Sequence, residues 1–213
     1  MHIKTKVKKI LALLDTHYPT DAACYLSHEA PYQLLIATIL SAQCTDDRVN
    51  MVTEELFVKY PTLAAFAAAD VSELERDIYS TGFYTMKAKN IIAAADMIIN
   101  KYGGVVPNDI DALTELPGVG RKTANLILGH VYGIPAIVVD THVKRISVKL
   151  GLATGDDPTK IEYALMKILP RDHWIRYNTQ VIAHGRTICK ARSPLCGECL
   201  LNELCDNHKK TNL

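Results

Sequence analysis

The sequence predicts an all-α protein. Apolar residues recur at the three- and four-residue spacing of a helix along nearly the whole chain, while the two-residue alternation of a strand is almost absent. Helix caps and breakers divide this pattern into roughly ten segments. The one strand candidate, residues 134–139, is short and has no partner strand in the sequence, so we expect no sheet.

Capping residues place the helices expected in the first half of the chain. Pro31 suits the first position of a helix, and Thr45 or Asp46 can cap the next one. Ser72 begins a short helix that Gly82 closes, since glycine readily takes the left-handed conformation of a helix end. The expected helices are 31–41, 46–60, 72–82 and 86–101.

The second half shows the same signals. Asn108 is the expected cap of a short helix, and Asp140 occupies the N-cap position of a helix that Gly151 ends. Asp157 followed by Pro158 starts another helix. The expected helices are 108–116, 121–131, 140–150, one from 157, and 173–188.

Composition indicates a folded globular protein. The chain has 213 residues, of which 48% are hydrophobic and 22% charged, enough for one domain or two small ones. No apolar run approaches the ~20 residues that span a bilayer. The basic N-terminus lacks the long apolar segment and small-residue cleavage site of a signal peptide, so we expect a cytoplasmic protein.

Charge is segregated along the chain although the net charge is only +1. Residues 117–150 contain five basic residues and one acid, and residues 171–192 contain the same numbers. Residues 46–77 contain eight acids and three bases. This distribution allows one surface to meet phosphates, although solvated helix faces would also explain any single segment.

A glycine-rich turn separates two of the expected helices. In Leu116-Pro117-Gly118-Val119-Gly120, proline fixes φ and the two glycines let backbone N–H groups approach a ligand closely. Amides at the N-terminus of a helix bind anions such as a DNA phosphate. A plain helix–helix turn is the alternative.

Four cysteines close to one another near the C-terminus predict a metal centre. Cys189, Cys196, Cys199 and Cys205 are separated by six, two and five residues. Four thiolates suit a tetrahedral zinc ion or a [4Fe–4S] cluster. Disulfides are not expected in a chain without a secretion signal.

The turn, followed by Arg121-Lys122 and by Val138-Val139-Asp140-Thr141-His142-Val143, resembles the helix-hairpin-helix, Gly/Pro-rich loop and aspartate motif of the DNA glycosylase (HhH-GPD) superfamily. The lysine and the cysteine loop are similar to those of the endonuclease III family, and the similarity covers most of the chain. The resemblance implies two helical domains with DNA in a cleft between them. These are a six-helix domain at 24–133 and an iron–sulfur cluster domain at 1–23 plus 134–213.

The resemblance gives Lys122 and Asp140 catalytic roles. Lys122 would attack C1′ of the damaged nucleotide, displace the base and form a Schiff base that leads to strand cleavage by β-elimination. Asp140 would assist the lysine and stabilise positive charge on the sugar. Each residue alone has a simpler interpretation, Lys122 as a solvated or phosphate-binding lysine and Asp140 as a helix cap.

The resemblance also implies the cofactor and the DNA contacts. The four cysteines would hold one [4Fe–4S] cluster with a structural role. Gln43 matches the position that inserts into DNA, and Phe83 matches an apolar wedge, although an aliphatic residue is the more usual one there. Asp46 is a candidate for the damage pocket or a helix cap, and His184 for a phosphate contact or a structural group. The expected DNA contacts are Gln43, Phe83, Gly118, Gly120, Arg121, His142, Arg145, Lys190 and Arg192.

Function is therefore expected to be that of a monomeric DNA glycosylase and abasic-site lyase acting on oxidised pyrimidines in duplex DNA. A monofunctional mismatch glycosylase is the first alternative, which Lys122 disfavours because such enzymes lack the lysine nucleophile. A non-catalytic DNA-binding protein whose cysteines bind zinc or sense redox state is the second.

Overall fold

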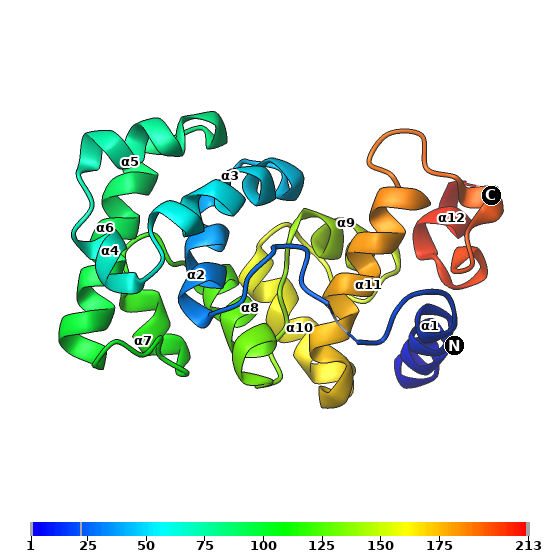
Figure 1. Cartoon of the computed structure of the whole chain (residues 1–213). Coiled ribbons are helices and arrows are strands. Elements are labelled where there is room, and N and C mark those ends of the chain that lie inside the picture. The colour runs from blue at the N-terminus through cyan, green and yellow to red at the C-terminus, as the bar shows by residue number, and fades with distance from the viewer. Residues whose placement is uncertain (1, 22, 212–213) are drawn as a thin grey trace. The chain divides into compact units, whose positions relative to one another are not determined.

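The computed structural model describes residues 2–21 and 23–211, and it contains α-helices and short 3-10 helices but no strand within those ranges (Figure 1). The all-α prediction is confirmed. Residues 134–139 form neither a helix nor a strand, and the Val138 carbonyl accepts a hydrogen bond from Asn178 Nδ2 at 3.1 Å. A side chain thus satisfies a backbone group that a sheet would otherwise satisfy.

The chain divides into two compact units, residues 24–132 and residues 1–23 with 133–213. We call them the central unit and the terminal unit. Across the described residues, no helix is both long enough and apolar enough to cross a membrane.

The central unit is built around α2 and α6. Every residue of α2 from Leu34 to Leu40 is buried, and α6 contributes Ala88, Ile91 and Ile98 to the same interior. The other helices of this unit pack around these two. In order, its helices are α2 (Pro31–Leu40), α3 (Asp46–Lys59), α4 (Leu63–Ala67), α5 (Val71–Asp77), η1 (Tyr79–Thr81), α6 (Tyr84–Tyr102), α7 (Ile110–Glu115) and α8 (Arg121–Tyr132).

Of the helix caps in the central unit, one falls on one of its two predicted candidates and two differ from the prediction. Thr45, not Asp46, caps α3, with its side chain accepting from Arg48 N. Asp70 caps α5 through Glu73 N, so Ser72 lies inside that helix, and Asp109 rather than Asn108 caps α7. Asn108 is adjacent to Asp109 and Ser72 lies two residues after Asp70, and each residue that caps has extended backbone geometry. The five-residue α4 was not predicted, because it is too short for its apolar period to be recognised.

The terminal unit packs the N-terminal helix against segments from the other end of the sequence. Ile10 and Leu14 of α1 are fully buried in a core that also contains Ile146, Ile161 and Tyr177. Its helices are α1 (Ile3–His17), α9 (Thr141–Lys149), α10 (Pro158–Ile168), η2 (Arg171–His173), α11 (Trp174–Thr187), η3 (Cys196–Glu198), η4 (Asn202–Leu204) and α12 (Asp206–Thr211).

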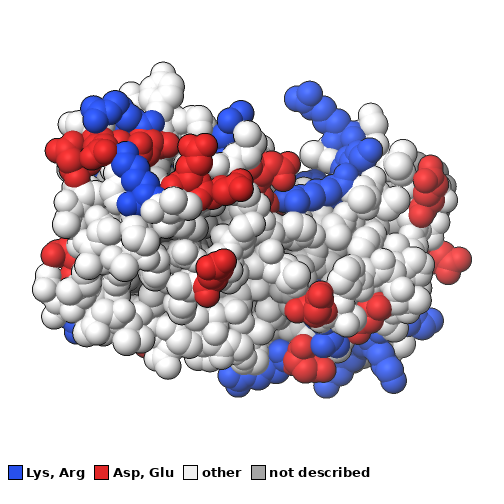
Figure 2. All heavy atoms as spheres, viewed as in Figure 1, with Lys and Arg blue, Asp and Glu red and all other residues white. Residues whose placement is uncertain are grey.

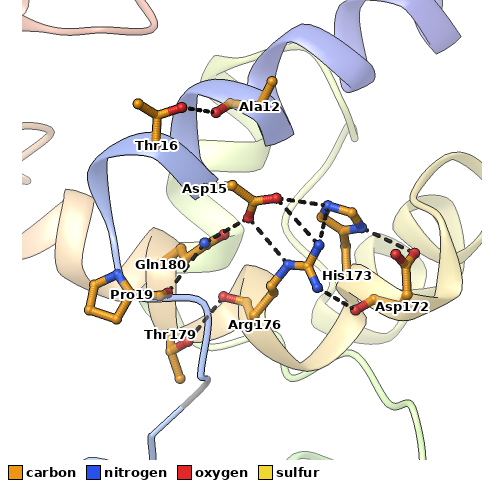
Figure 3. A network of polar contacts seen from close by, with 9 residues as sticks. All are labelled: Ala12, Asp15, Thr16, Pro19, Asp172, His173, Arg176, Thr179 and Gln180. Carbon is orange, nitrogen blue, oxygen red and sulfur yellow. Dashed lines mark hydrogen bonds and ion pairs between the residues drawn. The ribbon is translucent and has the colours of Figure 1, made fainter.

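Polar contacts at both ends of α1 reinforce this packing. Near its start, Lys6 Nζ lies 2.6 Å from Asp206 Oδ1 of α12. Near its end, the Asp15 carboxylate accepts hydrogen bonds from Gln180 Nε2 at 2.9 Å and Arg176 Nε at 3.2 Å, both on α11 (Figure 3). The N-terminal helix is therefore fixed to the unit that contains the cysteines.

Candidate active site and cysteine pocket

The turn between α7 and α8 combines two buried side chains with two exposed glycines. Leu116 is 2% exposed and Val119 is 6% exposed, and Val119 N donates to Leu116 O at 3.0 Å. Gly118 has a φ of 78°, and a Cβ there would lie 2.9 Å from the Cβ of Asn90 on α6. Glycine is required at this position by conformation and by space, and the turn presents its glycines to solvent.

Lys122 is the second residue of α8, directly after this turn, and it is exposed. Ala124, Ile127 and Leu128 bury the opposite face of the helix. Because the apolar face fixes the rotation of α8, the lysine side chain extends into solvent, where a substrate can reach its amine.

Asp140 is the N-cap of α9, as the sequence predicts. Its Oδ1 accepts a hydrogen bond from Val143 N at 2.7 Å, while Val143 and Ile146 bury the helix in the terminal unit. The carboxylate is partly exposed, and its second oxygen, Oδ2, is not the atom that makes the cap. Lys122 belongs to the central unit and Asp140 to the terminal unit.

Gln43 and Phe83 share an unusual backbone conformation. Their φ angles are 54° and 49°, in the left-handed region that non-glycine residues seldom adopt, and both side chains are exposed. Phe83 is 67% exposed, and the neighbouring Tyr79 and Met86 are 64% and 63% exposed. Tyr79 and Met86 were not predicted from the sequence, because exposure of an apolar side chain has no local sequence signal.

All four cysteines line one pocket. Lys149, Pro194 and Leu195 also contribute to it. Every cysteine is a free thiol in this structure. Within the described residues, no three His, Cys, Asp or Glu side chains lie close enough to hold a single metal ion.

The electrostatics of these thiols fit a cationic inorganic core. Burial raises the pKa of Cys189, and the charges of Lys149 and Arg145 partly oppose that shift. Burial also raises the pKa of Cys199, with smaller contributions from the other three cysteines. Four thiolates around one pocket therefore repel each other, and iron ions offset this repulsion by binding them.

His184 is a buried structural residue, not a phosphate contact. It is 1% exposed, and burial lowers its pKa to about 4, so the ring is neutral. Its Nδ1 lies 2.8 Å from Tyr18 Oη and its Nε2 lies 3.6 Å from Cys199 Sγ. The structural interpretation of this histidine is confirmed, and its ring lies between Tyr18, which follows α1, and a cysteine of the pocket.

The predicted basic contacts of the terminal unit fall into two groups. Lys190 and Arg192 are exposed in the loop that follows α11, where Figure 2 shows lysine and arginine side chains gathered. Arg145 Nη2 is directed inward and donates to the Cys189 carbonyl at 2.8 Å, and it also lies 3.2 Å from His142 Nδ1. Arg145 thus supports the start of the cysteine loop.

In the central unit, Figure 2 shows acidic side chains gathered over α3 and α5.

Family comparisons identify the protein class. The model of the HhH-GPD superfamily of base excision DNA repair proteins matches residues 36–171. The model of the iron–sulfur binding domain of endonuclease III matches residues 189–205, which begin and end on cysteines of the pocket. An endonuclease III of Synechocystis is 51% identical over 203 residues, which cover 95% of this chain and 92% of that protein.

The chain belongs to the endonuclease III family. It is a base excision repair enzyme with DNA glycosylase and abasic-site lyase activity, and it carries one [4Fe–4S] cluster. A trapped endonuclease III–DNA covalent intermediate superposes with a TM-score of 0.93 at 46% identity, covering all of both chains. A thermostable thymine-DNA glycosylase superposes at 0.80 with 27% identity, covering 98% of this endonuclease III family member and 97% of that chain.

Proposed function

We propose that this endonuclease III family member removes oxidised pyrimidines from duplex DNA and cleaves the resulting abasic site through a Schiff base on Lys122. The observation that carries the proposal is the position of this lysine. It is exposed in the first turn of α8, directly after a turn that presents Gly118 and Gly120 to solvent. The glycine amides can bind the phosphate of a nucleotide while the amine reaches its sugar.

The covalent step starts at Lys122 Nζ. The amine donates its electron pair to C1′ as the N-glycosidic bond breaks, and the base leaves with that bonding pair and takes up a proton. Loss of a proton from nitrogen and opening of the C1′–O4′ bond, with protonation of O4′, give the iminium. Removal of a C2′ proton then expels the 3′ phosphate by β-elimination. Asp140 keeps one carboxylate oxygen on the helix cap, and the other can stabilise positive charge on the sugar.

The remaining predicted residues are assigned to DNA binding and to the cluster. We assign the exposed Gln43 and Phe83 to filling the gap that an extruded base leaves. Cys189, Cys196, Cys199 and Cys205 would hold the cluster, which supplies a structural centre that shapes the loop of Lys190 and Arg192. The proposed phosphate and backbone contacts are Gly118, Gly120, Arg121, His142, Lys190 and Arg192, and the predicted contact Arg145 would act through the cysteine loop that it supports.

The rest of the proposal concerns the domains of the protein and its location. Residues 24–133 are proposed as the helix-hairpin-helix domain, and 1–23 with 134–213 as the cluster domain. We also propose that the protein acts as a monomer in the cytoplasm, where the bacterial chromosome lies.

Borohydride trapping tests the proposal. The protein is mixed with a duplex that contains one thymine glycol, and sodium borohydride reduces any Schiff base to a stable protein–DNA adduct. We expect an adduct that is lost in Lys122→Ala and retained in Lys160→Ala, which removes another exposed first-turn lysine, on α10. Base release without an adduct would indicate a monofunctional glycosylase, and an adduct that survives Lys122→Ala would identify a different nucleophile.

A further inference from the structure

Lys87 of α6 is a buried charged residue that the mechanism above does not use. It is 4% exposed. Its Nζ donates hydrogen bonds to Leu40 O at 2.8 Å and to Thr81 O at 2.9 Å. Removing an ammonium from water is costly unless strong acceptors replace the water, and burial lowers the pKa of Lys87. An apolar side chain would avoid that cost but would leave both carbonyls without this donor, so the ammonium contributes more than packing.

The two acceptors are backbone carbonyls at the bases of two different loops. Leu40 is the last residue of α2, so its carbonyl has no partner within the helix. Thr81 is the last residue of η1. Forty-seven residues of sequence separate Lys87 from Leu40, yet one ammonium binds both segments. Lys87 therefore sets the spacing between the end of α2 and the end of η1.

Each of these segments leads directly to a strained, exposed residue. Gln43 lies three residues after Leu40, and Phe83 lies two residues after Thr81. Both have left-handed backbone conformations, with φ of 54° and 49°. A non-glycine residue keeps such a conformation only where its surroundings determine it, and such positions cluster at functional sites. Lys87 binds the backbone at the base of both loops, the one that carries Gln43 and the one that carries Phe83.

We propose that Lys87 is a positioning residue for base extrusion, holding the Gln43 and Phe83 loops at the separation at which both side chains enter the DNA together. The inference rests on the gap-filling roles proposed above for Gln43 and Phe83. Phe83 O also accepts a hydrogen bond from Lys87 N at 3.1 Å, so the same residue fixes the wedge through its backbone and its side chain. Without the ammonium, the two carbonyls lose their shared donor and the loops can move apart.

The test compares Lys87→Met, which keeps the unbranched chain as far as Cε and removes the donor, with Lys89→Met on the exposed surface of the same helix. Two rates are measured for each cluster-containing protein under single turnover. One is the rate of base removal from a thymine glycol duplex, where Gln43 and Phe83 would fill the gap that the extruded base leaves. The other is strand cleavage at an abasic site in a single-stranded oligonucleotide, which has no stacked duplex to enter.

We expect Lys87→Met to lose about 100-fold on the duplex, the scale of a small misplacement of reacting groups, and to retain most of its single-strand cleavage. Lys89→Met should match the wild type on both substrates. Parallel losses on both substrates, or no loss on the duplex, would overturn the proposal. If the wild type makes no Schiff base with the thymine glycol duplex, the proposed function fails instead, so the two failures are distinguishable.

A double-mutant cycle provides a readout that a general folding defect would not change. In a protein that already carries Gln43→Ala and Phe83→Ala, Lys87→Met should cause little further loss on the duplex, because the residues through which it acts are gone. Full additivity would contradict the positioning role. Thermal melting monitors folding, and Lys87→Gln, which retains an amide donor, replaces Lys87→Met if that variant does not fold. Failure of both variants to fold would assign Lys87 to folding alone and overturn the proposal.

Discussion

Tyr18 and His184 are joined by a hydrogen bond of 2.8 Å between Oη and Nδ1, although 166 residues separate them in sequence. The tyrosine follows α1 directly, and the histidine lies on α11 with its other nitrogen 3.6 Å from Cys199 Sγ. The two rings meet edge to face, with centroids 5.8 Å apart. The N-terminal segment therefore orients the residue that contacts a cysteine of the pocket.

Tyr18→Phe should make the cluster more labile. Groups that orient the partners of a metal ligand affect metal retention by about tenfold or more when they are removed. We expect the visible absorbance of the iron–sulfur cluster to decay about tenfold faster in a chelator than it does in the wild type. Tyr163→Phe, at an exposed position of α10, is the control. Equal decay rates for Tyr18→Phe and the wild type would show that the tyrosine does not support the cluster.

Gly118→Ala should unfold at a lower temperature than the wild type. The substitution places a Cβ at a φ of 78° and 2.9 Å from Asn90, so we expect a loss of about 1–3 kcal/mol in the free energy of unfolding. At Gly120 a Cβ would meet no atom within 4 Å, and Gly120→Ala should change stability by less than about 0.5 kcal/mol.

Comparing Gly118→Ala with Gly120→Ala also distinguishes an effect on folding from an effect on DNA binding. Gly120→Ala should weaken binding to an abasic-site duplex despite normal stability, because its methyl group keeps the phosphate from the turn. Thermal melting and a fluorescence-anisotropy titration provide the two measurements. Normal DNA affinity in Gly120→Ala would exclude the turn as a phosphate site.

Asp140→Asn should separate the capping role of this residue from its catalytic role. Asparagine caps helices about as well as aspartate, so stability should change little, whereas Asp140→Ala should lose about 1 kcal/mol. Both variants should lose about 100-fold or more in single-turnover base removal, because both lack the carboxylate charge. Activity that follows stability, with Asn active and Ala inactive, would restrict Asp140 to the cap of α9.

Asp15 should make the terminal unit sensitive to acid. Burial alone would raise the pKa of this carboxyl, but the hydrogen bond from Gln180 and the charge of Arg176 outweigh it and hold the pKa below the ordinary 3.8. A lowered folded-state pKa means that the ionised group stabilises the fold above about pH 4 and loses this effect as the pH falls through its folded value. The side chain is 28% exposed, so solvent reduces the contribution to about 1 kcal/mol.

Urea unfolding of Asp15→Asn and the wild type tests this at several pH values. Near neutral pH we expect the free energy of unfolding of Asp15→Asn to be about 1 kcal/mol below that of the wild type. This difference should narrow below about pH 4. Asp21→Asn, at an exposed position, should be as stable as the wild type at every pH. A difference for Asp15→Asn that stays constant into acid would mean that the loss comes from packing and not from ionisation.

Helix caps show how well local sequence predicted the fold. Asp140 and Asp157 cap helices as expected, because a side chain that accepts from an amide two or three residues later needs no other part of the chain. Ser72 and Asn108 were the wrong choices, since Asp70, two residues before Ser72, and Asp109, directly after Asn108, cap instead. Where two neighbouring residues can cap, the backbone conformation decides, and packing sets that conformation.

The sequence by itself determined the helical class, the turn that precedes Lys122, the cap at Asp140 and the closely spaced cysteines. These features depend on residues a few positions apart or on the chemistry of single side chains. Tertiary structure decided that Lys87 binds two loops, that His184 is buried between Tyr18 and Cys199, and that Phe83 and Met86 are exposed. Burial depends on which distant segments pack together, and the hydrogen bonds of Lys87 and His184 reach partners 47 and 166 residues away, beyond the range of any local pattern.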